Sequence, residues 1–291
     1  MKLTLGPIPY FWDRQTVYAF YEQVMASPFD TVALGETVCS KRRQLSRNDW
    51  LDIARTLQAC GKHVMVSTLA LIEAESELGS LRTLCQEAQA LGLMIEANDY
   101  AAVNLLSKAG VEFAGGASLN LYNAQSVQLL RGMGLVRWQP PLELSKDQIQ
   151  LILSEQQAGL ETDLFVWGHM TLAYSARCYT ARAHDIAKDE CGFVCLQHPQ
   201  GLSAASQDGL ELFTLNGIQT QSGKPLDLLD AWDEAGQIGI TGLRLAADSF
   251  EVLNIASTLR EAILEGRPLK RSEKTDSCNG YWNHIAGMQR V

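Results

Sequence analysis

The sequence lacks the features that would place it in several common classes of protein. No apolar run reaches the roughly 18 residues that a membrane-spanning helix needs. The first residues, MKLTLGPIPYFWDR, turn to Gly-Pro too soon to form the apolar core of a signal peptide. The net charge of −9 disfavours a broad nucleic-acid surface, because phosphate contacts need clustered Lys and Arg. We therefore expect a cytoplasmic protein with no membrane span and no nucleic-acid partner.

The sequence also has no G-x-G-x-x-G fingerprint after its first expected strand, which weakens a dinucleotide-binding interpretation. No linker or low-complexity tract divides the chain. Instead, short β-rich runs alternate with helical patterns almost from end to end. The expected strands are residues 3–6, 31–36, 63–68, 93–99, 111–117, 135–140, 162–169, 211–217 and 239–246. A helical pattern follows each of them except 162–169, which opens a cysteine-rich segment.

This repeated strand–helix order predicts a parallel sheet whose faces are both covered by helices. Seven to nine such units in a chain of this length favour a closed barrel over an open, doubly wound sheet. We therefore predict an α/β fold, a TIM-barrel-like parallel β/α barrel, formed by residues 1–291 as a single domain with a cysteine-bearing loop segment. The tail, residues 269–291, is polar and then aromatic, and we expect it to wrap back on the barrel.

Cysteine is scarce, and its seven copies form no closed set of disulfides. In a cytoplasmic chain they are expected to be reduced thiols used for packing, metal binding or catalysis. Cys60 and Cys85 lie on the expected inward faces of two helices, where a cysteine behaves as a small hydrophobe. Cys278 lies in the polar tail with no partner nearby in sequence. Four cysteines remain, and they are Cys39, Cys178, Cys191 and Cys195.

These four cysteines fall in two loops, around residues 36–43 and 170–198, and each loop follows an expected strand. In a β/α barrel the loops that follow the strands gather at one face, so the four thiols can converge. The spacing C-x12-C-x3-C is neither the paired pattern of zinc fingers nor the ferredoxin run. Four thiolates suit either a structural zinc ion or a 4Fe–4S cluster, and the spacing leaves both open.

The charged residues of the second loop have two interpretations. Three cations can offset the negative charge of a thiolate cluster, or they can pair with neighbouring acids in a solvated loop. The cations are Arg177, Arg182 and Lys188, and the acids are Asp185, Asp189 and Glu190. Gly192 allows the backbone to approach a sulfur closely.

Further polar residues at the ends of expected strands point toward the same face as the cysteines. They are Glu36, Asn98, Asp99, Ser118, Asn216 and Asp248. Each either lines a pocket or caps the helix that follows, and Asp99 and Asp248 are good capping types. Asp248 is also a candidate for a salt bridge with Arg244. No set of nucleophile, base and orienting group is evident, so no catalytic residue is assigned.

Several of these segments resemble one branch of the collagenase-like peptidase family, whose catalytic type is unassigned. They are LGETVCSKRR (34–43), LAYSARCYTAR (172–182), KDECGFVC (188–195) and LNGIQTQS (215–222). SLNLYN (118–123) and PPLELS (140–145) are typical of the wider family. The resemblance runs from the first strand to about residue 250, and it implies a 4Fe–4S cluster on Cys39, Cys178, Cys191 and Cys195. His169 departs from relatives, which more often carry Arg after this Gly, and it is either an active-face residue or a satisfied polar one.

The resemblance also implies a function in oxygen-independent ubiquinone synthesis. Members of this branch work as heterodimers with a UbiU-like paralogue to hydroxylate the aromatic ring of polyprenylated precursors. A lipid-carrier protein is accessory, and prephenate is linked to related members as the oxygen donor. Because four cysteines would occupy all four irons, electron transfer or structural support is favoured over substrate binding at the cluster.

Two alternatives to this function remain open at the level of sequence. One is a non-catalytic subunit that stabilises its partner and holds zinc or a cluster, with Trp232, Tyr281 and Trp282 at the interface. The other is the peptidase that the family name suggests.

Overall fold

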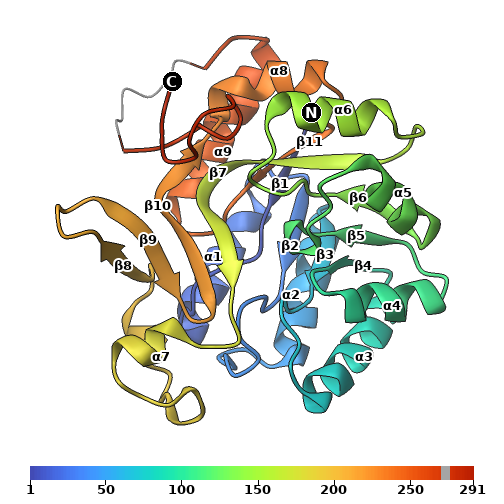
Figure 1. Cartoon of the computed structure of the whole chain (residues 1–291). Coiled ribbons are helices and arrows are strands. Elements are labelled where there is room, and N and C mark those ends of the chain that lie inside the picture. The colour runs from blue at the N-terminus through green and yellow to red at the C-terminus, as the bar shows by residue number, and fades with distance from the viewer. Residues whose placement is uncertain (270–275) are drawn as a thin grey trace.

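The structure, a computed structural model, describes residues 1–269 and 276–291. Eight parallel strands close into a barrel in the order β11-β1-β2-β3-β4-β5-β6-β7, and the pairing of β11 with β7 completes the ring (Figure 1). The predicted fold class is confirmed. The barrel strands are β1 (Lys2–Leu5), β2 (Thr31–Leu34), β3 (His63–Ser67), β4 (Met94–Ala97), β5 (Phe113–Gly115), β6 (Leu135–Trp138), β7 (Glu161–Tyr174) and β11 (Gly242–Leu245).

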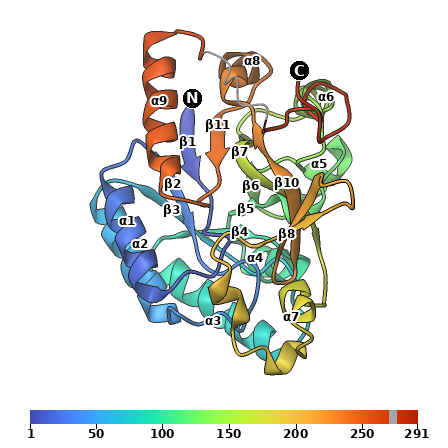
Figure 2. The ribbon, with the colours of Figure 1, turned by 90° about the vertical axis from the view of Figure 1, so that its left-hand side faces the viewer.

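Helices cover the outside of the barrel, and the side view in Figure 2 places α9 against β1 and β11. The covering helices are α1 (Arg14–Met25), α2 (Arg47–Ala59), α3 (Glu75–Ala90), α4 (Tyr100–Lys108), α5 (Ala124–Gly132), α6 (Lys146–Ser154), α8 (Trp232–Gln237) and α9 (Glu251–Glu265). Shorter helical turns are η1 (Ala117–Leu119), α7 (Tyr179–Ala183), η2 (Lys188–Glu190), η3 (Val194–Gln197) and η4 (Leu229–Ala231). No helix in the described part of the chain is long and apolar enough to cross a membrane.

Local capping chemistry starts several of these helices where the sequence predicts. The Ser145 side chain accepts from the backbone N–H of Gln148, and the Gln148 side chain reaches back to the Ser145 N–H, which forms a capping box at the start of α6. Asp99 caps α4 by accepting from the N–H of Ala101. These caps fix where each loop at the carboxyl end of the barrel meets its helix.

A three-stranded antiparallel extension is joined to the barrel through β7. This strand continues past the barrel wall and pairs there with β10 (Gln219–Asp227), which pairs with β9 (Glu211–Asn216), which pairs with β8 (Leu202–Ala205). The strand expected at 211–217 therefore exists, but its expected place in the strand–helix series is wrong. It is antiparallel, it lies outside the barrel, and a tight turn at Gly217 leads to another strand instead of a helix.

Two further sequence expectations concern cysteines outside the two loops. Cys85 is buried on α3, as predicted, but Cys60 is exposed, because α2 ends at Ala59 and Cys60 lies past the face that packs on the barrel. Cys278 is buried, and its backbone bridges to Leu226 of β10. The tail thus wraps back on the barrel over residues 276–291, whereas residues 270–275 of the expected segment lie outside the described residues.

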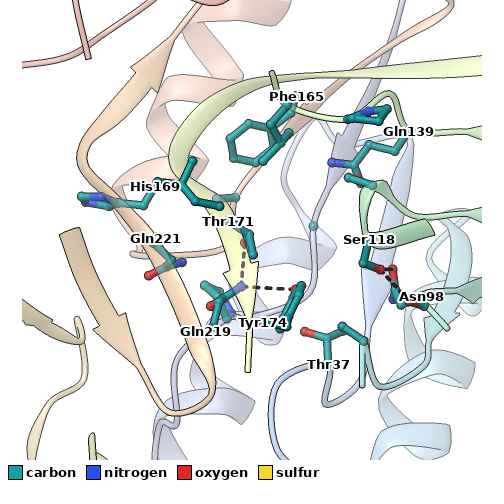
Figure 3. A pocket seen from close by; sticks show the side chains of 18 of the residues that line it. Thr37, Asn98, Ser118, Gln139, Phe165, His169, Thr171, Tyr174, Gln219 and Gln221 are labelled. Carbon is teal, nitrogen blue, oxygen red and sulfur yellow. Dashed lines mark hydrogen bonds between the residues drawn. The ribbon is translucent and has the colours of Figure 1, made fainter. Parts of the chain in front are cut away.

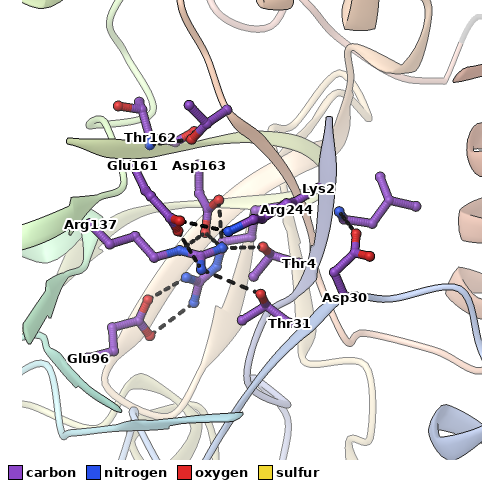
Figure 4. A network of polar contacts seen from close by, with 12 residues as sticks. Lys2, Thr4, Asp30, Thr31, Glu96, Arg137, Glu161, Thr162, Asp163 and Arg244 are labelled. Carbon is purple, nitrogen blue, oxygen red and sulfur yellow. Dashed lines mark hydrogen bonds and ion pairs between the residues drawn. The ribbon is translucent and has the colours of Figure 1, made fainter. Parts of the chain in front are cut away.

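Paired charges fill the interior of the barrel (Figure 4). Arg137 forms a bidentate pair with Asp163, with Nε–Oδ2 at 2.8 Å and Nη2–Oδ1 at 2.9 Å. Arg244 forms a second bidentate pair with Glu96, whose other neighbour is the Ser67 hydroxyl, at 2.5 Å. Burial alone would raise the pKa of Glu96, but the Arg244 guanidinium outweighs it and holds that pKa below its usual range. The expected Arg244–Asp248 salt bridge is wrong, because Glu96 takes both terminal nitrogens of the guanidinium.

Candidate functional site

A polar cavity of about 340 Å³ opens above the Arg244–Glu96 pair, at the carboxyl end of the barrel strands. Its lining comes from the loops that follow seven of the barrel strands, from the strand β7 itself and from β10 (Figure 3). Its uncharged hydrogen-bonding side chains are Thr37, Asn98, Ser118, Asn120, Gln139, Thr171, Tyr174, Gln219 and Gln221. The carboxyl-end face is where β/α barrels build their active sites. A cavity with this lining suits a small ligand with several oxygen or nitrogen groups.

Asn98 and Ser118 form one fixed wall of this cavity, on the right in Figure 3. The Asn98 backbone N–H donates to the Thr68 hydroxyl and its side-chain amide donates to the Thr68 carbonyl, each at 3.0 Å. The Ser118 hydroxyl donates to the Asn98 carbonyl at 2.6 Å. Residue 116 has to be glycine, since a Cβ there would lie 1.9 Å from the Asn98 Oδ1. Both residues were predicted at this face, and the structure places both in the cavity lining.

The opposite wall comes from β10, a strand that the sequence analysis missed. The Gln219 amide donates to the Thr171 hydroxyl at 2.6 Å and lies 3.4 Å from the Tyr174 hydroxyl. Gln221 is 2% exposed, and its Oε1 has no hydrogen-bond partner among the described residues. A buried carbonyl oxygen without a partner is costly, so it is available to accept from a bound ligand.

His169 lines the cavity beside β10, whereas Asp248 interacts with His169 but does not itself line the cavity. The Nδ1 of His169 is 2.7 Å from the Ser222 carbonyl, and because a carbonyl can only accept, Nδ1 carries the proton. A β-bulge between Gln221 and Pro225 of β10 accompanies this contact. Burial raises the pKa of Asp248 to about 6, and its closeness to His169 opposes that rise. Asp248 does not cap α9, whose first residue is Glu251.

The four predicted cysteines line one small pocket next to the cavity. Cys39, Cys178, Cys191 and Cys195 share this pocket with the cationic side chains of Lys41, Arg42 and Lys188. Three short chain segments connect the cavity to the thiol pocket. In each, one residue lines the cavity and a residue two to four positions away lines the thiol pocket. The pairs are Thr37 and Cys39, Tyr174 and Cys178, and Gln219 and Gly217. The loops at 36–43 and 170–198 therefore converge, although they are more than a hundred residues apart in sequence.

The arrangement of the thiols bears on which metal they fit. In the described part of the chain, no three His, Cys, Asp or Glu side chains are grouped so as to hold one metal ion. A zinc ion binds sulfur at about 2.3 Å and needs all its thiolates around a single point. A 4Fe–4S cluster binds each thiolate through a different iron, so its ligands stand further apart around a shared pocket. Four cysteines line one pocket, and their arrangement leaves zinc and a 4Fe–4S cluster both open.

Arg42 is the residue of this site that the sequence analysis missed. It is 6% exposed, its Nη1 donates to the Pro9 carbonyl at 2.9 Å, and its Nη2 donates to the Asn216 Oδ1 at 2.7 Å. Its Nε has no hydrogen-bond partner among the described residues. Burial raises the pKa of the Cys39 and Cys195 thiols, and the Arg42 charge acts in the opposite direction on both. A buried cation with a free N–H beside four thiols suits a negatively charged group.

The loop that carries Cys39 is held by Glu36. The Glu36 Oε1 accepts from the backbone N–H groups of Val38 and Cys39, at 2.8 Å and 3.0 Å, and lies 3.9 Å from Arg42. Glu36 therefore shapes the thiol pocket and does not line the cavity as expected. Asn216 also serves the thiol pocket, by orienting Arg42.

The charged residues of the second loop follow neither expected interpretation fully. Lys188 lines the thiol pocket and pairs with Glu73 at 2.7 Å, whereas Asp189 pairs with Lys41 of the first loop. Arg177 and Arg182 are exposed and do not line the pocket. The expected pairing of the three cations with Asp185, Asp189 and Glu190 is therefore wrong, because the two loops exchange charges with each other and with α3. Gly192 has a positive φ of 55°, and a Cβ there would have no atom within 4 Å, so its role is conformational and no close approach requires it.

Comparisons with known proteins agree with this fold. Residues 18–264 match the model of peptidase family U32. A putative dihydrodipicolinate synthetase from Pseudomonas aeruginosa has a TM-score of 0.50 at 12% identity, covering 91% of this chain and 77% of its own. The U32 peptidase Mk0906 has a TM-score of 0.47 at 12% identity, covering 85% of this chain and 93% of its own. The match spans most of the barrel and both cysteine loops, and the chain belongs to peptidase family U32.

Proposed function

We propose that this chain is a 4Fe–4S subunit of the UbiV type, part of a cytoplasmic, oxygen-independent hydroxylase. The substrate is the aromatic ring of polyprenylated ubiquinone precursors, and the partner is a UbiU-like paralogue in a heterodimer. A lipid-carrier protein is the accessory and prephenate the candidate oxygen donor. The observation that carries the proposal is the convergence of Cys39, Cys178, Cys191 and Cys195 on one pocket that also holds the buried Arg42.

The residues of this pocket fit a cluster by their chemistry. Four thiolates supply a complete ligand set, and Lys41, Arg42 and Lys188 supply positive charge around it. The bound cluster would supply one-electron transfer. Glu36 holds the Cys39 loop through two backbone N–H groups, and Asn216 holds Arg42 with its free Nε available to a sulfur. Arg42 thus offsets charge without itself being reactive.

The cavity residues have a separate part in this proposal. The walls at Asn98, Ser118, Gln219 and Gln221 bind and orient a small polar molecule by hydrogen bonds. A polyprenyl chain is apolar and far longer than a cavity of about 340 Å³ can hold, so the tail of the lipid substrate lies elsewhere. This division agrees with electron delivery by this chain and ring chemistry at or near the partner.

The test is to purify the chain without oxygen and to measure iron, sulfide and visible absorption, then to repeat this with Cys191→Ala. About four irons and four sulfides with a broad brown absorbance are expected, and the variant should lose them. Cys60→Ala is the matched control, because Cys60 is exposed at the end of α2 and lies outside both cysteine loops, and it should keep the full iron content. Zinc in place of iron would instead support a structural metal subunit.

Activity is tested in cells that need the hydroxylation to make ubiquinone without oxygen. Co-expression of this chain with a UbiU-like paralogue should restore the quinone, and Cys191→Ala should not. A chain that carries the cluster and yet restores nothing would contradict the hydroxylase role while leaving the cluster assignment intact. Cleavage of peptides by the purified chain would favour the peptidase alternative.

The partner-stabilising alternative loses part of its basis in the structure. Trp282 is 3% exposed, and its indole N–H donates to Glu234 at 3.0 Å, so it packs within the chain itself. Trp232 and Tyr281 are only half-buried and both pack against the core. The expected aromatic interface at the tail therefore lacks its central residue.

A further inference from the structure

Two consecutive residues between Cys191 and Cys195 adopt the left-handed backbone conformation. Gly192 has a φ of 55°, and Phe193 has a φ of 58° and a ψ of 35°. The backbone N–H of Val194 donates to the Cys191 carbonyl at 3.1 Å, which closes a tight turn around them. Turns with two positive φ angles are usually built from Gly, Asn or Asp, because a larger side chain crowds the backbone there. Phe193 is therefore strained, whereas Gly192 is not.

Packing within the chain offsets little of this strain. Phe193 is 44% exposed, and among the described residues its ring meets one other aromatic ring, that of Phe11, at a centroid distance of 6.0 Å. Phe11 itself is 5% exposed, and the Arg42 guanidinium lies 5.6 Å from the centre of its ring. An exposed aromatic ring on a strained backbone costs stability relative to glycine or asparagine. Stability therefore does not account for phenylalanine at this position.

The position of Phe193 in the thiol pocket differs from that of its neighbours. Among the described residues that line this pocket, Phe193 alone is exposed, and the others are buried or half-buried. It is also the only aromatic residue of this lining, and Val194 contributes the other apolar side chain. A side chain that lines a pocket and is nevertheless exposed lies between that pocket and solvent. The ring of Phe193 thus stands on the solvent side of the four thiols.

We propose that Phe193 is the cover of the thiol pocket. The strained turn holds its ring between the four thiols and solvent, and the ring slows the access of water, oxygen and chelators to the group that the thiols bind. The lifetime of bound iron rests on the proposed function, whereas the access of solvent to the thiols does not.

A cover of this kind acts through solvent access. All four cysteines of the pocket are only half-buried, so the rest of the lining does not seal them from solvent. An apolar shell around a metal site controls how easily water reaches the metal and its ligands. Removing the ring should therefore speed every reaction that needs a solvent molecule at these thiols. Cysteines elsewhere in the chain should react as before.

A pair of variants separates the ring from the strain. Phe193→Ala and Phe193→Gly remove the same ring, but only glycine also relieves the left-handed backbone. In metal-free protein, Phe193→Gly should unfold about 2 °C or more above Phe193→Ala. Thermal unfolding measures this difference and checks that both variants fold. Equal unfolding temperatures would show that residue 193 is not strained and would remove that step of the argument.

Alkylation of the metal-free, reduced chain by iodoacetamide tests the cover directly, with peptide mapping to follow each cysteine. The four pocket thiols should react about fivefold or more faster in both Phe193→Ala and Phe193→Gly than in the native chain. Phe193→Tyr keeps a ring and should react at nearly the native rate. Cys60 is exposed and serves as the internal standard, because its rate should be the same in every variant. Phe213→Ala is the matched control, since Phe213 is 41% exposed on β9, and it should leave the pocket thiols unchanged.

The lifetime of bound iron is the second readout. In chain loaded with iron without oxygen, the visible absorbance should decay about fivefold or more faster in air for Phe193→Ala and Phe193→Gly, and iron should pass faster to a chelator under argon. A native chain that binds no iron would contradict the proposed function, and the alkylation rates would still decide the cover. Pocket thiols that react equally fast in the native chain and in both variants would overturn the proposal.

Discussion

The barrel interior and the thiol pocket both bury charged or polar groups, but they treat them differently. Inside the barrel, both arginines have bidentate carboxylate partners, Arg137 with Asp163 and Arg244 with Glu96. In the thiol pocket, Arg42 has an Nε without a hydrogen-bond partner among the described residues, beside four free thiols. The two barrel arginines thus face carboxylates, whereas Arg42 keeps a buried N–H beside the thiols, which makes the thiol pocket the candidate binding site.

The greatest loss of stability should come from removing one partner of a charged pair inside the barrel. Arg244→Met leaves the Glu96 carboxylate buried without its cation, which should lower the free energy of unfolding by about 3 to 5 kcal/mol. Urea denaturation of the full chain measures the change. Replacing both residues, in Arg244→Met with Glu96→Gln, should recover much of the loss, since no unpaired charge remains. Equal losses in the single and double variants would mean that packing, and not charge pairing, sets the stability here.

A smaller effect is expected beside His169, where Asp248 is half-buried without a direct cation partner. Its folded pKa of about 6 lies above the usual value of 3.8, so its contribution to stability is full below pH 3.8 and is lost as pH rises through about 6. Asp248→Asn should remove this loss and raise the free energy of unfolding at neutral pH by about 3 kcal/mol. Denaturation from acid to neutral pH measures it. The same gain at acid pH, where the native carboxyl is already neutral, would contradict the explanation.

The sequence predicts the barrel well because its signals are local. Every barrel strand except β7 is a short run of 3 to 5 residues, mostly apolar, and capping residues such as Ser145 mark where helices begin. The extension is harder to predict because its inner face serves the cavity. β10 reads Gln-Thr-Gln-Ser-Gly-Lys-Pro-Leu-Asp, a polar run with Gly and Pro that resembles a loop. It becomes a strand only because β7 continues past the barrel and offers it an edge.

Some features of the cysteine loops can likewise be predicted from the sequence, and others cannot. Their placement after two barrel strands was sufficient to predict that Cys39 and Cys178 converge. The role of Arg42 could not be predicted, because its contact with Asn216 joins residues 174 positions apart. Arg177 adjoins Cys178 in sequence and Arg182 is four residues from it, yet both are exposed and neither lines the pocket. Proximity along the chain is a poor guide in a loop without regular structure, since no periodicity fixes which side faces inward.

Two cysteine substitutions, one in the core and one in the thiol pocket, should change stability least. Cys191 is half-buried in a loop and Cys85 is 4% exposed on α3, so the same substitution tests both environments. In metal-free protein, Cys85→Ala should lower the free energy of unfolding by about 1 kcal/mol, because it leaves a small void in the core. Cys191→Ala should change it by less than about 0.5 kcal/mol, as surface substitutions usually do. Urea denaturation and iron content should therefore rank the two variants in opposite orders. Cys191→Ala should lose the metal and keep the stability of the barrel, whereas Cys85→Ala should lower that stability and keep the metal. A large loss of stability in metal-free Cys191→Ala would mean that the thiol is part of the packing, and would remove the reason for treating the pocket as a site built for a bound group.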